Sequence, residues 1–265
     1  MAQRHNARQE EETPTVASAE MAGSEGSDKQ RLDQELQAEE SRISEVYAER
    51  KRLIPTDRYS SRNPGNLFIR REIERHLLSI LQSSRCQPLS SKRILDIGCG
   101  SGFWLQQFVG WGAKLQNLFG IDLRAAGIAE AKEGGLEGAN LKVGSATRLG
   151  FADESFDLVM QFAVFSSVLH EPSRRRIASE MIRVLKPGGY IVWYDFFVNN
   201  PWNRDVRGLG KRELNDLFPG CRPHFYRVTV APPFTRRMGR LAPVLYPALT
   251  SIKLCSTHYL AFLEK

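Results

Sequence analysis

The chain has 265 residues, of which 42% are hydrophobic and 25% charged, and its formal net charge at pH 7 is +7. These proportions are ordinary for a globular protein, and the length suits one large domain with an appendage or two small domains. No stretch is long and apolar enough to span a membrane, and we expect no signal peptide because the first residues lack an apolar run.

The four cysteines, Cys86, Cys99, Cys221 and Cys255, show neither metal-ligand spacing nor a dense disulfide framework. We therefore expect reduced thiols in a cytoplasmic protein, and no metal site. The positive charges are scattered along the chain, which favours a role in solubility over an anionic partner.

The N-terminal third divides into two regions by composition. Residues 1–30 are polar and rich in small side chains, and we expect a disordered tail because such a composition cannot bury a core. Residues 31–90 predict two helices, since apolar residues recur at helical spacing over 32–54 and again over 67–81. The loop between them carries Tyr59 among polar groups, which suggests either a binding loop or an ordinary surface connection.

A glycine-rich turn organises the rest of the chain, residues 91–265. Ile94 to Ile97 predicts a short buried strand, Gly98 and Gly100 break it, and a helix is predicted from Phe103 to about Trp111. A strand, a tight turn and a helix N-terminus begin a nucleotide-binding βαβ unit. Glycine at these positions lets a ligand approach the backbone closely.

Two acidic residues indicate what kind of ligand this turn would hold. Asp96 lies at the end of the first strand, where a carboxylate would repel a pyrophosphate and suit a cation. Asp122 ends the next predicted strand, where an acid is placed to accept hydrogen bonds from ribose hydroxyls. The spacing G-x-G-x-G also departs from the dinucleotide fingerprint, because Phe103 stands where the third glycine is needed. The implied ligand has a ribose, an adenine-like base and a positive end.

The remaining predicted elements alternate between strands and helices, which is typical of a parallel sheet covered by helices. We predict strands at 140–143, 156–161, 190–196, 226–230 and 258–263, and helices at 123–131, 172–185 and 210–218. Because the carboxyl ends of such strands face the ligand, Gln161 and Phe162 should touch the ligand or the substrate.

Residues 231–257 form an insertion between the last two predicted strands, where a hairpin would suffice. A long insertion in a compact domain is usually functional or disordered, and this one is apolar enough to be helical and packed. It is predicted to form one wall of an acceptor pocket or a homodimer contact.

Four motifs resemble those of the class I S-adenosylmethionine-dependent methyltransferases, in that family's order. They are Ile94 to Gly102, Gly120-Ile121-Asp122, Phe156 to Gln161, and Leu185-Lys186-Pro187-Gly188-Gly189. The resemblance implies an α/β fold, a Rossmann-like doubly wound sheet of seven strands with the last strand antiparallel. It also favours a lid at residues 31–90, because N-terminal extensions in this family often cover the cofactor cleft; the alternative for the helix at 32–54 is one that only packs on the domain.

The resemblance implies S-adenosyl-L-methionine as the cofactor and a set of residues that bind it. These are Asp96, Gly98, Cys99, Gly100, Asp122, Leu123, Ser145, Ala146, Thr147, Gln161, Phe162 and Tyr59. Ser145 departs from the family, which usually has an aspartate there that bonds the adenine amino group. A hydroxyl can still form that hydrogen bond, but it brings no charge.

Methyl transfer depends mainly on alignment, and a hydroxyl acceptor would add the need for a general base. The candidates for this base are Asp195, His170 and His258. Asp195 is favoured by its place at the carboxyl end of a buried strand, and its alternative role is to cap the following turn. Each histidine is a surface or packed residue in the alternative reading.

The expected function is transfer of a methyl group to a small-molecule acceptor, with an oxygen nucleophile, in a natural-product or glycan pathway. One alternative is a methyltransferase acting on RNA or a peptide, and another is a cofactor-binding scaffold without catalysis. We disfavour a nucleic-acid partner, because the segment after the fourth strand lacks the Asn/Asp-Pro-Pro-aromatic tetrapeptide common in base and amide N-methyltransferases.

Overall fold

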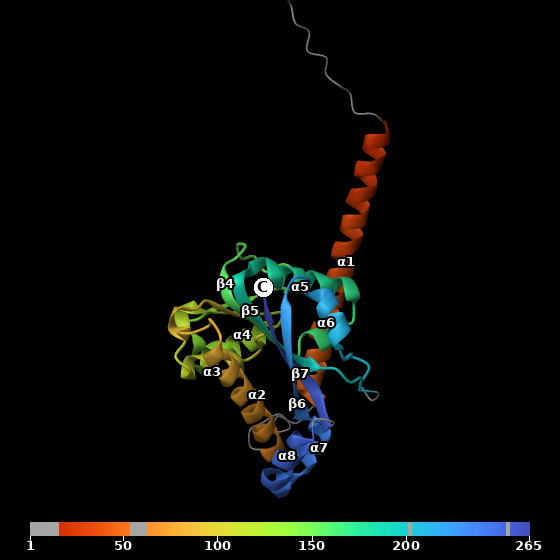
Figure 1. Ribbon diagram of the computed structural model, residues 1–265. Coiled ribbons are helices and arrows are strands. Elements are labelled where there is room, and N and C mark those ends of the chain that lie inside the picture. The colour runs from red at the N-terminus through yellow and green to blue at the C-terminus, as the bar shows by residue number, and fades with distance from the viewer. Residues whose placement is uncertain (1–15, 54–62, 201–202, 253–254) are drawn as a thin grey trace, which may run out of the picture.

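A seven-stranded sheet forms the centre of the molecule (Figure 1). The structure is a computed structural model, and it describes residues 16–53, 63–200, 203–252 and 255–265. The strands are β1 (Ile94–Ile97), β2 (Leu118–Asp122), β3 (Asn140–Val143), β4 (Phe156–Phe162), β5 (Leu185–Phe196), β6 (Arg222–Val230) and β7 (Ser256–Glu264). The helices are α1 (Val16–Leu53), α2 (Pro64–Ser83), α3 (Phe103–Gly110), α4 (Ala125–Ala131), α5 (Glu171–Val184), α6 (Lys211–Leu217), α7 (Pro232–Arg237) and α8 (Ala242–Ser251).

The order of the strands in the sheet is β3-β2-β1-β4-β5-β7-β6. The first five run parallel, and β7 lies antiparallel between β5 and β6. The chain reverses its direction of travel between β1 and β4, so the carboxyl ends of those strands flank a topological switch point, where ligands bind in open α/β sheets. The predicted doubly wound sheet with an antiparallel last strand is therefore confirmed.

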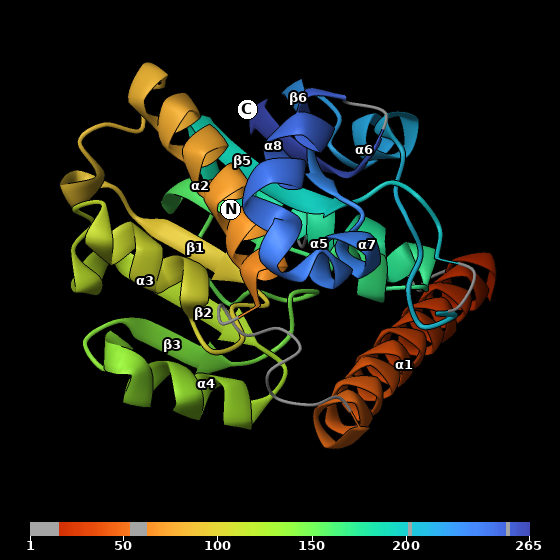
Figure 2. The same cartoon turned by 90° about the horizontal axis from the view of Figure 1, so that it is seen from below.

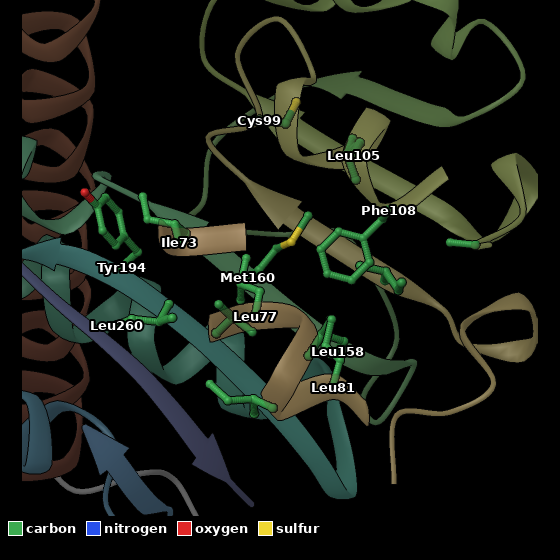
Figure 3. Close-up of a cluster of buried hydrophobic side chains, with 14 of the residues drawn as sticks. Ile73, Leu77, Leu81, Cys99, Leu105, Phe108, Leu158, Met160, Tyr194 and Leu260 are labelled. Atoms are coloured by element: carbon green, nitrogen blue, oxygen red, sulfur yellow. The ribbon is translucent and has the colours of Figure 1, made fainter. Parts of the chain in front are cut away.

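Two apolar layers sandwich the sheet. On one face α2, α3, α4 and α8 pack through residues such as Leu77, Leu105 and Phe108, which Figure 3 shows gathered around Met160. On the other face α5 and α6 pack through Met181 and Leu214 against Trp193 and their neighbours. The central strands are apolar on both faces because both faces are covered.

Helix α1 differs from the prediction at its N-terminal end. It begins at Val16 instead of Leu32, so residues 16–30, expected to be disordered, are its first turns, while residues 1–15 lie outside the described residues. The physical reason is that Ala, Glu and Gln in this stretch are good helix formers, and a helix propagates once its amphipathic part is held. This first part projects beyond the body of the protein (Figure 1).

The insertion between β6 and β7 is helical, as predicted. Helices α7 and α8, joined by a short 3₁₀ turn at Gly239–Leu241, pack on α2 (Figure 2). Thr235 of α7 lies against Gly65 at the start of α2, so closely that a Cβ on Gly65 would be 2.4 Å from the Thr235 carbonyl oxygen. Within the described ranges, no helix has both the length and the apolarity to cross a bilayer.

Candidate functional site

The turn after β1 is held open by three glycines in the left-handed region. Gly98, Gly100 and Gly102 have φ values of 68°, 52° and 75°, a conformation in which a Cβ is strained. The Gly98 amide donates to the carbonyl oxygen of Ile121 at 2.7 Å, which joins the turn to β2. A Cβ on Gly98 would lie 2.5 Å from the side chain of Val164, so the turn also has no room for a larger residue there.

Asp122, at the end of β2, fastens this turn. One carboxylate oxygen accepts a hydrogen bond from the Gly100 amide at 2.8 Å, and the other accepts one from the Arg124 amide at 2.9 Å. The Arg124 guanidinium forms an ion pair with the same carboxylate at 3.4 Å. A carboxylate has about four acceptor positions, so Asp122 retains capacity for a ligand's hydroxyl groups.

A cleft of about 800 Å³ opens beside Asp122, at the carboxyl ends of the parallel strands. Seven of the residues predicted to bind a cofactor line it: Gly98, Asp122, Leu123, Ser145, Ala146, Thr147 and Phe162. The topology brings them together from β1, β2, β3 and β4, although they span more than sixty positions in the sequence.

Helix α1 forms the outer wall of the cleft. Its residues Glu39, Glu40, Ile43, Ser44 and Tyr47 line the cavity, and their spacing places them on one face of the helix. The attachments of this face to the core are mostly polar. Tyr47 Oη and Ser167 Oγ lie 3.0 Å apart, and Glu39 accepts hydrogen bonds from the amides of Leu169 and His170.

Glu40 inserts a carboxylate at the end of β3. Its Oε1 accepts hydrogen bonds from the hydroxyl of Ser145 and from that of Thr147, the latter at 2.9 Å. The two hydroxyls are themselves 2.7 Å apart. The family usually has an aspartate where this chain has Ser145. In this structure the carboxylate of Glu40, from α1, lies in contact with the Ser145 hydroxyl.

Asp96 is buried below the turn, where its carboxyl is electrostatically perturbed. Burial raises the pKa of its carboxyl well above the ordinary value, and the charge of Asp122 raises it further. A positive ligand near the two acids would oppose both effects, because an opposite charge favours the ionised form.

Phe162 reaches the cleft, whereas its neighbour Gln161 does not. Phe162 stacks on Trp104 with ring centroids 4.2 Å apart and lines the cavity. Gln161 is predicted to touch the ligand or the substrate, but its side chain is fully buried. Its amide nitrogen donates to the Tyr194 carbonyl at 3.3 Å, and its oxygen accepts from the Val164 amide at 2.8 Å. Gln161 therefore shapes the turn that follows β4.

Asp195, predicted as a base, does not line the cleft either. Its carboxyl is fully buried and absent from the cleft wall, with one oxygen accepting from the Ser166 amide at 2.9 Å and the other from the Phe196 amide at 3.0 Å. Burial raises its pKa to about 7, although these hydrogen bonds act in the opposite direction. Asp195 therefore caps the turn at Phe165–Ser167, which precedes it in the chain, and not the following turn that the structural alternative named.

Neither candidate histidine lines the cleft. His170 caps α5, with Nδ1 2.9 Å from Ser173 Oγ and Nε2 3.6 Å from Glu35 of α1. His258 is buried and stacks on Tyr194 with centroids 5.0 Å apart. Burial, aided by Arg236, lowers the His258 pKa to about 3, so this ring is a weak base. The predicted catalytic roles of both histidines do not fit their positions.

Three of the remaining predicted ligand residues lie in or near the turn without lining the cavity. Asp96, Cys99 and Gly100 flank the cleft; the Cys99 side chain points into the apolar layer (Figure 3), and burial raises the pKa of its thiol. Tyr59 lies outside the described residues. The sequence pattern predicts a helix over this part of α1 and a lid over the cleft, but it does not single out Glu39, Glu40 or Ser44 as lining residues.

Known proteins with similar sequences are methyltransferases. Residues 95–193 match the protein family described as "Methyltransferase domain". The chain is 35% identical over 136 residues to phthiotriol/phenolphthiotriol dimycocerosates methyltransferase 1 of Mycobacterium ulcerans. This alignment covers 48% of this chain and 49% of that protein. It is 33% identical over 117 residues to methyltransferase GfsG of Streptomyces halstedii, covering 43% and 41%. The chain thus spans about half the length of the curated relatives it matches.

A solved structure shows the same fold at low sequence identity. The S-adenosylmethionine-dependent methyltransferase from Aquifex aeolicus matches with a TM-score of 0.52 and 15% identity, over 82% of this chain and 97% of that one. The expected fold is therefore confirmed. Over residues 95–193 the chain is similar to methyltransferase domains, and it shares its fold with an S-adenosylmethionine-dependent methyltransferase.

Proposed function

We propose that the whole chain is an S-adenosylmethionine-dependent methyltransferase that transfers a methyl group to a small, largely apolar acceptor. The observation that carries the proposal is the cleft at the switch point, which joins a glycine turn, Asp122 and the carboxylate of Glu40 in one cavity. A fold alone does not establish an activity, so the argument depends on whether this site suits the cofactor.

The donor set suits an adenosyl sulfonium. Asp122 is placed for the ribose hydroxyls, and the turn from Gly98 to Gly100 allows the ligand close to the backbone. Ser145, Thr147 and Glu40 offer acceptors at the adenine end, where Glu40 supplies the charge that Ser145 lacks. The acids Asp96 and Asp122 favour a ligand that carries positive charge.

The bound cofactor would supply a methyl group already activated by its positive sulfur. The chain's own contribution is then alignment and exclusion of water. Phe162, held by its stack on Trp104, and Val164 shape the end of β4, and α1 closes the outer side. Good alignment can lower a barrier by ~7–11 kcal/mol. We infer that the reaction does not use Asp195, His170 or His258 as its base.

We further propose an oxygen nucleophile on a lipid or natural-product acceptor, and a reaction in the cytoplasm. The names of the relatives from Mycobacterium ulcerans and Gibberella zeae, the latter a sterol 24-C-methyltransferase, support an apolar acceptor. The wall of the cleft is mainly apolar around Ile43, Ile121 and Ile177, which also suits such an acceptor. The four free cysteines are consistent with a reducing compartment.

Two measurements test the proposal. Calorimetry should detect binding of S-adenosylmethionine and of its demethylated product, and no binding of NAD. Transfer of labelled methyl groups should then label a component of an organic-solvent extract more than one of the aqueous fraction. Binding of NAD alone would contradict the assignment of the cofactor, and cofactor binding without any labelled product would indicate a scaffold.

A further inference from the structure

Exposed apolar side chains concentrate in the insertion between β6 and β7. In the described part of the chain, nine large hydrophobic side chains are exposed, and five of them lie between residues 234 and 252. These five are Phe234, Leu241, Val244, Leu245 and Ile252. Val244 leaves 74% of its surface in solvent, which is a larger fraction than any of the other eight. Scattered apolar residues need no explanation, but a concentration within one short segment does.

The insertion is firmly held, so this exposure is not a sign of poor packing. Ala242 and Tyr246 of α8 are buried against α2, and the Tyr246 hydroxyl donates to Glu72 at 2.6 Å. The Tyr246 ring also stacks on Phe68 with centroids 5.7 Å apart. Since Leu241, Val244 and Leu245 fall on the opposite face at helical spacing, α8 presents one apolar face to the core and another to solvent.

The surroundings of this exposed face are positively charged. Residues 231–254 contain Arg236, Arg237, Arg240 and Lys253 and no acidic residue. A groove of about 1570 Å³ adjoins α8, and Arg71, Arg75, Lys211 and Arg227 line it together with Tyr246 and Pro247. Glu72 also lies in the groove wall, but it is buried and accepts hydrogen bonds from the Thr229 amide and the Tyr246 hydroxyl.

We propose that the α7–α8 insertion docks on the surface of a bilayer that contains anionic lipids. Its exposed apolar side chains would enter the boundary between headgroups and acyl chains, and the exposed Arg237 would meet the lipid phosphates. A second copy of this chain is a poorer occupant of a self-complementary contact, because it would bring two sets of like charges together. The docking is independent of methyl transfer, since none of the insertion's described residues lines the cofactor cleft.

Co-sedimentation of the full chain with vesicles tests this proposal. We compare vesicles of phosphatidylcholine with vesicles that also contain phosphatidylglycerol, without cofactor. Two variants probe the surface: the double variant Leu241→Ser/Val244→Ser removes apolar contacts, and Arg237→Glu reverses one exposed charge. Matched controls are Val143→Ser and Lys114→Glu, which change an exposed apolar residue and an exposed cation outside the insertion.

The wild type and both controls should bind the anionic vesicles and sediment little with the neutral ones. Since each cation near such a surface contributes about a fivefold factor in partitioning, the charge reversal should weaken binding about tenfold or more. The apolar variant should weaken it further. All of the variants should retain the wild-type circular dichroism and S-adenosylmethionine affinity, because the changed side chains are exposed and outside the cleft.

Three results would overturn the proposal. The first is equal vesicle binding by the wild type and both insertion variants. The second is no preference of the wild type for anionic vesicles. The third is a dimer, detected by sedimentation equilibrium, that the variant Leu241→Ser/Val244→Ser abolishes while the wild type binds no vesicles. That third result would assign the exposed face to another copy of the chain.

Discussion

Replacing Glu40 with glutamine should weaken cofactor binding, because this carboxylate is the charged group at the Ser145 end of the cleft. In the structure Glu40 Oε1 accepts hydrogen bonds from the hydroxyls of Ser145 and Thr147. Glutamine keeps the length and shape of the side chain and removes the charge. The substitution therefore weakens the hydrogen bonds that hold α1 against Ser145 and Thr147, and it weakens the acceptor available to the cofactor's amino group.

The size of the effect follows from the hydrogen bonds that lose their charge. Hydrogen bonds to charged groups contribute ~1.5–3 kcal/mol, and the half-exposed position of Glu40 reduces this to about 1–2 kcal/mol. The S-adenosylmethionine dissociation constant should rise by roughly fivefold to thirtyfold. Calorimetry measures this directly. Glu45→Gln is the matched control, because Glu45 lies on the same helix and is exposed outside the cleft.

A double-variant cycle sharpens this test. Ser145→Asp places a second carboxylate against Glu40, so the single variant should bind the cofactor poorly, and adding Glu40→Gln should restore much of the affinity. Unchanged affinity in Glu40→Gln would refute the reasoning. Tighter binding would also refute it, since the carboxylate would then compete with the ligand for its place in the cleft.

Three further predictions concern the turn and the buried acids. Asp96→Asn should flatten the pH dependence of S-adenosylmethionine affinity. In the wild type the affinity should rise with pH, because a cation favours the ionised form of a carboxyl whose pKa is raised; proton release in calorimetry with two buffers measures this. Asp195→Asn should leave turnover per folded enzyme unchanged. It should lower the free energy of unfolding by about 1–3 kcal/mol in thermal melts at neutral pH, because either the Ser166 or the Phe196 backbone amide loses its carboxylate acceptor. Since the native Asp195 pKa is raised from 3.8 to about 7, the wild type should lose stability as pH rises through that interval, and a variant with the same slope would contradict this account. Gly98→Ala should weaken cofactor binding more than Gly112→Ala does, because both have positive φ but only Gly98 has a side chain within 2.5 Å of the added Cβ; equal effects would point to backbone strain alone.

The fold could be predicted from the sequence because its local signals agree with one another. The strand ending in Asp96, the glycine turn and the strand ending in Asp122 all lie within thirty residues, and each has a distinct pattern. The sheet order then follows from the family's known motifs. The start of α1 is not predicted because residues 16–30 have helix-forming side chains without the apolar periodicity that marks a packed helix.

The candidate site was only half predictable. Asp195 was placed correctly at the end of β5, but the direction of its side chain was not considered. Alternation along a strand puts Asp195 on the same face as Trp193, which packs beneath α5 and α6, and away from the face of Tyr194. Glu40 could not be paired with Ser145 from the sequence, because 105 positions separate them and no motif connects them.

The length of α1 has a mechanical consequence. The helix runs from Val16 to Leu53, and Glu35 is the most N-terminal of its residues whose ion pair with the core is seen, with His170. At 1.5 Å per residue, the part that precedes Glu35 is roughly 30 Å long. If α1 tilts about its attachments to let ligands in or out, this arm magnifies a small displacement at the cleft into a large swing at its tip. A fluorescent label at the exposed Asp28 would therefore report each opening sensitively.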